Sequence, residues 1–458
     1  MVIKPAILKG TRDFDANEIA RRNYIKATLQ TIFEQFGFNP IETPTMERLE
    51  TLSGQYGEEG DRLIFKILNS GEKVKKADVV ALSEGQFKKF THSVSEKALR
   101  YDLTVPMARY VAQHQNNLPF PFRRYQIQPV WRADRPQHGR FQEFYQCDAD
   151  IVGERSLWQE IEMVSLYDTA FKALGLDAVT LKINHRAILA ALADYVGAKN
   201  QLTDFTVALD KWDKIGKEGV QEELIDKGFS RQAIKTLFPL LEAKSTTKEK
   251  LNQLQTLFKK HQLDTIGLDE LQFIFGQLEA LNISVHLSFD LTLARGLHYY
   301  TGMIVEVIPP KSVQMGSLGG GGRYDDLTQI FGLKNMSGIG ISFGFERIYL
   351  VLESLNLFPK SVHAQKPVLF LNFGAQATIK SFSLVNQLQQ AGIAAELYPT
   401  SAKLKKQMLY ANKKQVEKVV LIGSDELEQK VFILKDMTTG KQTTYKTADL
   451  LSILRKGD

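Results

Sequence analysis

Sequence typical of β-strands occurs in two blocks that lie far apart in the chain, and this separation constrains the fold more than any other feature. The first block spans 122–152, and the second spans 285–343, where strand signals return around a glycine cluster. Between them, from about Arg186 to Leu281, the chain is lysine-rich, with apolar residues at helical spacing. We therefore expect one antiparallel sheet built from both blocks, with a helical module inserted between them.

Both ends of the chain predict further elements. Residues 15–37 place apolar side chains at helical spacing behind Asp15, an N-cap candidate with Glu18 three residues on. The next segment, FNPIETP, contains two prolines and is typical of an edge or interface strand, where a dimer contact could lie. From Lys366 onward, strand and helix signals alternate, as in a small α/β domain. This tail holds 14 Lys or Arg against 8 Asp or Glu, and its net charge of +6 equals that of the whole chain.

Composition and missing motifs exclude several classes of protein. The single cysteine, Cys147, rules out an intrachain disulfide and a thiolate-rich metal site, and we expect it to be buried. No run of about 18 apolar residues predicts a membrane span, and MVIKPAILKG does not read as a signal peptide, so we expect a cytoplasmic protein. The chain also lacks an HExxH zinc motif, a phosphate loop, and a strand leading into G-x-G-x-x-G.

The first strand block carries charged, amide and aromatic groups on one face. In FRRYQIQPVWR, period-two alternation separates an apolar face from a polar face formed by Arg124, Gln126, Gln128 and Arg132. In FQEFYQCDADIV, it forms a second polar face from Gln142, Phe144, Gln146, Asp148 and Asp150. If the two runs pair, these faces combine into a floor that could hold a nucleotide and a small cationic or polar ligand. A solvated sheet face is the alternative interpretation.

Two other short segments bear groups of the same kind. In RYDLTVP, Asp102 and Thr104 lie one strand step apart, just before a predicted helix. In LARGLHYYTG, Arg295 stands next to a glycine, where a guanidinium can approach a phosphate closely, and Tyr299 and Tyr300 follow. Taken alone, the first segment is ordinary, and surface ion pairing is the usual explanation for an arginine such as the one in the second.

Glycine is concentrated in the second strand block. Gly319–Gly322 could admit a ligand or a close backbone, or could form a plain flexible loop. In SGIGISFGFER, Gly338 and Gly340 leave one strand face bare, and Arg347 opens the next predicted helix.

Together these segments resemble the histidyl-tRNA synthetases, a family of class II aminoacyl-tRNA synthetases, over nearly the whole chain. GTRDF with FGFNPIETP is similar to the first class II motif, FRRYQIQPVWRADRPQHGRFQEFYQCDADIVG to the second, and SGIGISFGFERI to the third. LARGLHYYTG and GGGGRYDD resemble stretches peculiar to the histidine enzymes. The resemblance implies an α+β fold: a six-stranded antiparallel sheet flanked by helices, an inserted helical domain, and a C-terminal α/β anticodon-binding domain. The implied domain ranges are 1–185 with 282–355, 186–281, and 366–458.

The resemblance also implies an ATP site. Arg132 would hold the α-phosphate and the carboxylate side of histidine, Phe144 would stack on adenine, and Arg347 would clamp the outer phosphates. Arg140 and Arg135, in the loop between the two runs, would approach phosphates or the tRNA acceptor end. Mg²⁺ is expected to arrive with ATP, because bridging cations neutralise phosphate charge, and no separate protein metal site is implied.

The implied histidine site uses the remaining polar groups. Its α-amino group would be held by Asp102, Thr104 and Gln146. Its imidazole would be recognised by Asp150 and Tyr300, with Tyr299 beside them. Arg295 would stabilise charge as the carboxylate attacks the α-phosphate. His298 stands where many relatives carry Asp, and we assign it no catalytic role.

The resemblance implies ATP-dependent ligation of histidine to tRNA(His) through a histidyl-adenylate, in a homodimer formed through GTRDF and FNPIETP, with no membrane contact. Two rivals share the fold. One is the synthetase-like regulatory subunit of ATP phosphoribosyltransferase, which usually lacks the anticodon-binding domain that the tail here supplies. The other is a non-catalytic tRNA-sensing domain, which the retained Arg132, Arg295 and Arg347 disfavour.

Overall fold

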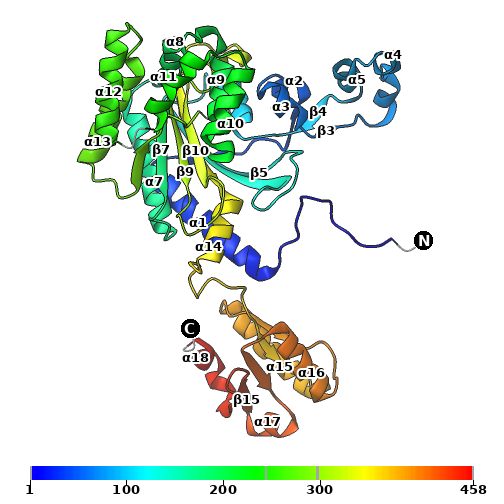
Figure 1. The fold of residues 1–458 in the computed structure, drawn as a ribbon. Helices are drawn as coiled ribbons and strands as arrows, with labels where there is room; N and C mark the ends of the chain where they lie inside the picture. The colour runs from blue at the N-terminus through cyan, green and yellow to red at the C-terminus, as the bar shows by residue number, and fades with distance from the viewer. Residues whose placement is uncertain (1–2, 243–244, 295–298, 456–458) are drawn as a thin grey trace. The chain divides into compact units, whose positions relative to one another are not determined.

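The structure is a computed structural model, and it describes residues 3–242, 245–294 and 299–455 (Figure 1). The chain separates into two compact units, with the boundary between Val362 and His363. Each unit contains its own sheet and its own apolar core.

Unit 1 is built on an eight-stranded sheet that draws strands from both blocks. Its strand order is β1-β5-β6-β11-β10-β9-β7-β8. The bounds are β1 (Asn39–Pro40), β5 (Phe122–Trp131), β6 (Glu143–Val152), β7 (Thr180–His185), β8 (His286–Phe289), β9 (Met303–Ile308), β10 (Gly319–Tyr324) and β11 (Gly338–Gly344). The six central strands are antiparallel, and β1 and β8 extend the edges in parallel. The predicted α+β class and the shared antiparallel sheet are confirmed, and each edge gains a short parallel strand.

Helices cover the apolar face of this sheet. They are α1 (Ala16–Gln35), α7 (Trp158–Ala173) and α14 (Phe345–Ser354). The predicted capping box is present, because Asp15 accepts from the backbone of Glu18 and the Glu18 carboxylate accepts from the backbone of Asp15. Phe33 of α1 packs on Tyr125, and Cys147 is fully buried in the same core, as predicted. With one face covered, the polar face of the sheet remains for a site.

In the described part of the stretch between β7 and β8, the regular elements are all helices, joined by turns and loops. Its helices are α8 (Arg186–Tyr195), α9 (Leu202–Leu209), α10 (Trp212–Asp226), α11 (Arg231–Glu242), α12 (Thr247–Lys260) and α13 (Ile266–Ala280). Their buried side chains share one core with the sheet, so the separation of 186–281 as a domain stays a prediction. No helix in the described ranges of the chain is long and apolar enough to cross a membrane.

The segment before β5 forms a small layer beside the sheet. A three-stranded sheet of β2 (Met46–Arg48), β4 (Lys97–Leu99) and β3 (Lys66–Ile67) is accompanied by five α-helices and a 3-10 helix at Gly71–Lys76. The α-helices are α2 (Leu49–Leu52), α3 (Gly57–Arg62), α4 (Val79–Ser83), α5 (Phe87–Val94) and α6 (Thr104–His114). Asp102 lies two residues before the start of α6, and Thr104 is the first residue of α6.

The glycine run Gly319–Gly322 forms the first part of strand β10 and is buried between β9 and β11, so the flexible-loop interpretation is wrong. Close packing explains the composition. A Cβ atom on Gly321 would lie 2.1 Å from the carbonyl oxygen of Gly340, and one on Gly340 would lie 2.0 Å from Asp150 Oδ1. Only glycine allows this approach of backbone and carboxylate.

Unit 2 has a five-stranded sheet in the order β13-β12-β14-β15-β16. The strands are β12 (Val368–Phe370), β13 (Ala395–Leu397), β14 (Lys418–Leu421), β15 (Val431–Asp436) and β16 (Gln442–Lys446). The helices are α15 (Ala375–Gln390), α16 (Leu404–Lys414), α17 (Ser424–Gln429) and α18 (Leu450–Arg455). The predicted α/β alternation holds as far as β14, and an antiparallel hairpin of β15 and β16 follows it.

Candidate active site

A cavity of about 480 Å³ lies over the polar face of the unit 1 sheet. Its lining includes ten of the predicted site residues: Asp102, Thr104, Arg132, Arg140, Phe144, Gln146, Asp150, Tyr299, Tyr300 and Arg347. These residues are spread over more than 240 positions of the sequence, and the fold brings them to one place. The predicted Arg295, together with His298, lies outside the described residues.

The pairing of β5 with β6 joins the two predicted polar faces into one floor. Arg124 lies opposite Asp150, Gln126 opposite Asp148, and Gln128 opposite Gln146. Arg124, Gln126, Asp148 and Asp150 are all buried. The solvated-face interpretation is therefore wrong for this stretch.

An ion pair holds the inner end of the floor. Arg124 Nη2 lies 2.6 Å from Asp150 Oδ2, with both side chains buried, and the Tyr324 hydroxyl donates to Asp150 Oδ1 at 2.6 Å. Burial raises the pKa of Asp150, although Arg124 and Tyr324 act in the opposite direction. Burial and the neighbouring Asp150 raise the pKa of Tyr324, which therefore stays a donor. Asp150 is thus a fixed acceptor in the cavity wall.

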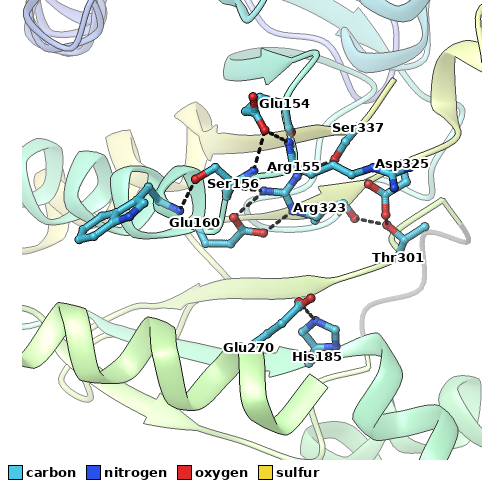
Figure 2. A network of polar contacts seen from close by, with 11 residues as sticks. Glu154, Arg155, Ser156, Glu160, His185, Glu270, Thr301, Arg323, Asp325 and Ser337 are labelled. Atoms are coloured by element: carbon cyan, nitrogen blue, oxygen red, sulfur yellow. Dashed lines mark hydrogen bonds and ion pairs between the residues drawn. The ribbon is translucent and has the colours of Figure 1, made fainter. Parts of the chain in front are cut away.

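A second buried arginine anchors the strand that carries Tyr324. Arg323 forms hydrogen bonds with Glu160 of α7 and with the Ser337 hydroxyl, and it donates to two backbone carbonyls of the segment before α7 (Figure 2). Because neighbouring strand residues point to opposite faces, fixing Arg323 behind the sheet presents Tyr324 to Asp150. This network positions the site without lining it.

The acceptors assigned to an amino group also line the cavity. Asp102 Oδ1 accepts from the Tyr56 hydroxyl at 2.8 Å and from the Val105 backbone at 3.2 Å. Burial raises the pKa of Asp102, and these hydrogen bonds and Arg132 lower it in part. Buried carboxylates with so few partners favour a cationic ligand.

Three arginines line the cavity beside the loop that joins β5 to β6, which we call its outer end. The Arg132 guanidinium carbon lies 4.3 Å from the Tyr101 ring centre and 5.2 Å from that of Phe144, and its Nε donates to the Tyr101 carbonyl at 3.0 Å. Arg347 donates to the carbonyl oxygens of Ser317 and Gly139, and Arg140 pairs with Asp134 at 2.8 Å. Guanidinium groups beside an aromatic ring suit a nucleotide with its phosphates.

The residue before Arg347 ties the N-terminal segment to the site. Glu346 is buried and accepts two hydrogen bonds from Arg22 of α1, at 2.7 and 2.8 Å, and it also forms an ion pair with Arg12. Burial raises the pKa of Glu346, but the two arginines bring it below its ordinary value. The Arg12 guanidinium also lies 3.5 Å from the Phe141 ring centre. GTRDF therefore contacts, within its own chain, two residues that line the cavity.

Sequence reasoning left several of these residues unassigned. Alternation predicts the positions of Arg124 and Asp148 on the polar face, and Tyr324 lies in the GGGGRYDD segment. Glu346 immediately precedes the predicted Arg347. Tyr56 had no local signal, because it reaches Asp102 from 46 positions away.

Two family models match the chain. The first, described as histidyl-tRNA synthetase, matches residues 78–348. The second, described as anticodon binding domain, matches residues 368–457. The two matches fall on unit 1 and unit 2 respectively.

Curated proteins similar to this chain extend along its length. A histidine–tRNA ligase of Christiangramia forsetii is 57% identical, covering 99% of this chain and 100% of the relative. A histidine–tRNA ligase of Flavobacterium johnsoniae is 52% identical, covering 97% and 98%.

Solved structures show the same fold. The crystal structure of histidyl-tRNA synthetase from a Nostoc species matches with a TM-score of 0.79 and 27% identity, and the match covers 100% of both chains. A Bacillus halodurans structure titled as an ATP phosphoribosyltransferase regulatory subunit/histidyl-tRNA synthetase matches with a TM-score of 0.71 and 22% identity, over 92% of this chain and 100% of that one. At that identity the second match speaks for the fold alone.

We predict that ionisation of Asp148 opposes folding. Burial raises the pKa of this carboxyl from 3.8 to about 7, with Arg124 lowering it and Asp150 raising it. Between pH 3.8 and about pH 7, this carboxyl is protonated in the folded chain and ionised in the unfolded chain. The free energy of unfolding that this group contributes therefore falls as pH rises from 3.8 to about 7. Asp148→Asn should then exceed the parent in free energy of unfolding at pH 8 by roughly 2–4 kcal/mol. The difference should vanish near pH 4. Urea unfolding of both chains from pH 4 to 8 measures it, and a less stable variant at pH 8 would contradict the prediction.

Proposed function

The chain belongs to the histidyl-tRNA synthetase family, and from this premise we propose that it ligates histidine to tRNA(His) in an ATP-dependent reaction that releases AMP and pyrophosphate. One observation carries the proposal. A single cavity is lined by a buried acceptor, by carboxylate and amide groups, and by three arginines, and along β6 the order runs from Asp150 through Gln146 to the loop beside the arginines. That order matches the imidazole, the ammonium and the phosphates of histidine with ATP.

Histidine would lie along the inner half of the floor. Asp150, held by Arg124 and Tyr324, would accept a hydrogen bond from one imidazole nitrogen, and Tyr300 would form a hydrogen bond with the other nitrogen. The α-ammonium, which can only donate, would meet acceptors on Asp102, Thr104 and Gln146. Tyr299 completes this end of the lining.

ATP would occupy the outer half. Phe144 would stack on adenine, Arg132 would contact the α-phosphate, and Arg347 would contact the outer phosphates, with Arg140 nearby. Mg²⁺ would be held chiefly by the phosphates of ATP and would neutralise their charge. No group of three acidic, histidine or cysteine side chains within the described part of the chain is arranged to hold a metal ion.

The first step would be adenylation. A carboxylate oxygen of histidine attacks the α-phosphorus, the bond to the bridging oxygen of pyrophosphate breaks, and histidyl-adenylate forms. Arg132 and, by resemblance, Arg295 would stabilise the charge that develops at this phosphate. Positioning and electrostatics suffice, without a protein nucleophile.

The second step would transfer histidine to tRNA. A hydroxyl of the terminal ribose attacks the adenylate carbonyl, and AMP leaves. Unit 2, which matches the anticodon-binding model and carries a net charge equal to that of the whole chain, would bind the tRNA. The regulatory-subunit rival is not favoured, because the ligase relatives cover 99% and 97% of the chain, including this unit.

We also propose a homodimer in the cytoplasm. Ile3, Ile7 and Leu8, which precede GTRDF, are largely exposed, and exposed apolar segments of this kind are often covered by a partner. Light scattering at micromolar concentration should give twice the mass of the chain, and a monomer mass would contradict the dimer. Cell fractionation tests the location.

We predict that the protein exchanges labelled pyrophosphate into ATP with histidine and with no other standard amino acid. Asp150→Ala should raise the KM for histidine by roughly fivefold to a hundredfold, because it leaves a buried imidazole N–H unpaired, at a cost of about 1–3 kcal/mol. Initial rates of exchange over a histidine titration measure both. Equal exchange with another amino acid, or none with histidine, would reject the assignment.

We predict that a chain ending at Val362, the last residue of unit 1, still forms histidyl-adenylate but charges tRNA(His) poorly. Its charging should also depend less steeply on salt, since fewer phosphate contacts remain. A milder variant of the full chain replaces three exposed lysines of unit 2, Lys405, Lys406 and Lys413, with glutamine. The matched control makes the same change at Lys248, Lys259 and Lys260 of α12.

The unit 2 variant should weaken charging without changing pyrophosphate exchange, and the α12 control should change neither. If the truncated chain loses both half-reactions in parallel, unit 2 supports the fold of unit 1. If it keeps full charging, unit 2 does not bind the tRNA.

A further inference from the structure

The side-chain amide of Gln146 has two ends in different surroundings. Its Nε2 lies 3.5 Å from each carboxylate oxygen of Asp148 and 3.4 Å from Ser342 Oγ. Its Oε1 is buried, and no hydrogen-bond donor within the described ranges reaches it. The reverse orientation would set the amide oxygen against two carboxylate oxygens, which are all acceptors. Asp148 and Ser342 thus favour one orientation of the amide.

This orientation decides what Gln146 can offer a ligand. An ammonium group has only donors, so an amide turned the other way would present N–H groups to it and repel it. The second acceptor for the same group is fixed in a similar manner, because the Tyr56 hydroxyl and the Val105 backbone both donate to Asp102 Oδ1.

We propose that Asp148 and Ser342 are positioning residues that hold the Gln146 amide with its carbonyl oxygen toward the α-ammonium of the bound amino acid. This inference rests on the proposed function, and it adds two residues that would act through Gln146. Asp148 lies on β6 between Gln146 and Asp150, and Ser342 lies opposite it on β11. Both line the cavity.

The orientation should depend on the charge of Asp148. The charged groups that act on it are Arg124 of β5, Asp150 of β6 and Asp102 before α6, while Ser342 of β11 is neutral. A protonated Asp148 gains an O–H donor, which can bond to the amide oxygen and turn it away from the ligand. Burial raises the pKa of Asp148 to about 7. Binding of the ligand's α-ammonium by Gln146 should therefore weaken as pH falls through about 7.

The test is a mutant cycle in pyrophosphate exchange at pH 8. Asp148→Asn, which can turn either its oxygen or its amino group toward Gln146, should raise the KM for histidine about tenfold. The KM for ATP should stay within about twofold. In a Gln146→Ala background, adding Asp148→Asn should change the histidine KM by less than about twofold. The matched control is Asp168→Asn on α7, where the carboxylate bonds to Ser284 and Val285 outside the cavity and the histidine KM should not change.

Ser342→Ala should also raise the KM for histidine, but by less. If Asp148→Asn does not fold, the same mutant cycle can be made with Ser342→Ala and Gln146→Ala. A pH series adds a second readout. The ratio of the histidine KM of Asp148→Asn to that of the parent should shrink from pH 8 to pH 6, because the parent loses its orientation there too. Taking the ratio cancels the titration of histidine itself.

The outcomes separate the inference from the proposed function. An unchanged histidine KM in both variants, or an equal effect with and without Gln146, overturns the positioning role while leaving the parent enzyme active. A KM ratio that is constant with pH does the same. A parent that shows no histidine-dependent exchange refutes the proposed function, and this inference falls with it.

Discussion

The buried ion pair between Arg124 and Asp150 is the constraint on which the floor of the cavity depends. Removing one partner of such a pair typically costs about 3–5 kcal/mol, because the other is left buried and unpaired. The pair is formed across the register of β5 and β6, so it ties that register to the position of Asp150. It also accounts for glycine at position 340, since a Cβ there would collide with the Asp150 carboxylate. Much of the glycine-rich sequence of β10 and β11 follows from this close packing.

The floor holds more negative groups than its inner cation can balance. Burial raises the pKa of Asp102, Asp148 and Asp150, and Arg124 offsets this only in part. A ligand that brings a positive charge to this end is therefore favoured over a neutral one. The outer end has the opposite character, with Arg132, Arg140 and Arg347 around the lining. A zwitterionic amino acid beside a polyphosphate fits both ends at once.

Local patterns predicted the parts of the molecule that local physics decides. Period-two alternation assigned Arg124, Asp148 and Asp150 to one face correctly, and the Asp15 capping box marked the start of α1. Burial could not be deduced in the same way, because the glycines of β10 resemble a loop until their neighbours in the sheet are known. The bond from Tyr56 to Asp102 and the pairing of Arg22 with Glu346 depend on tertiary structure alone. The roles of individual residues rested on resemblance to a family, and for Arg295 they still do.

The central claim is that the buried carboxylates of the cavity bind the positively charged amino group of the substrate. Competition of two histidine analogues against histidine in pyrophosphate exchange tests it most directly. Histidinol keeps the ammonium and lacks the carboxylate, whereas imidazolepropionate keeps the carboxylate and lacks the ammonium. The account predicts that histidinol inhibits at a concentration at least about tenfold lower, the scale of a lost hydrogen-bonded charge. Equal inhibition by the two analogues, or stronger inhibition by imidazolepropionate, would contradict it.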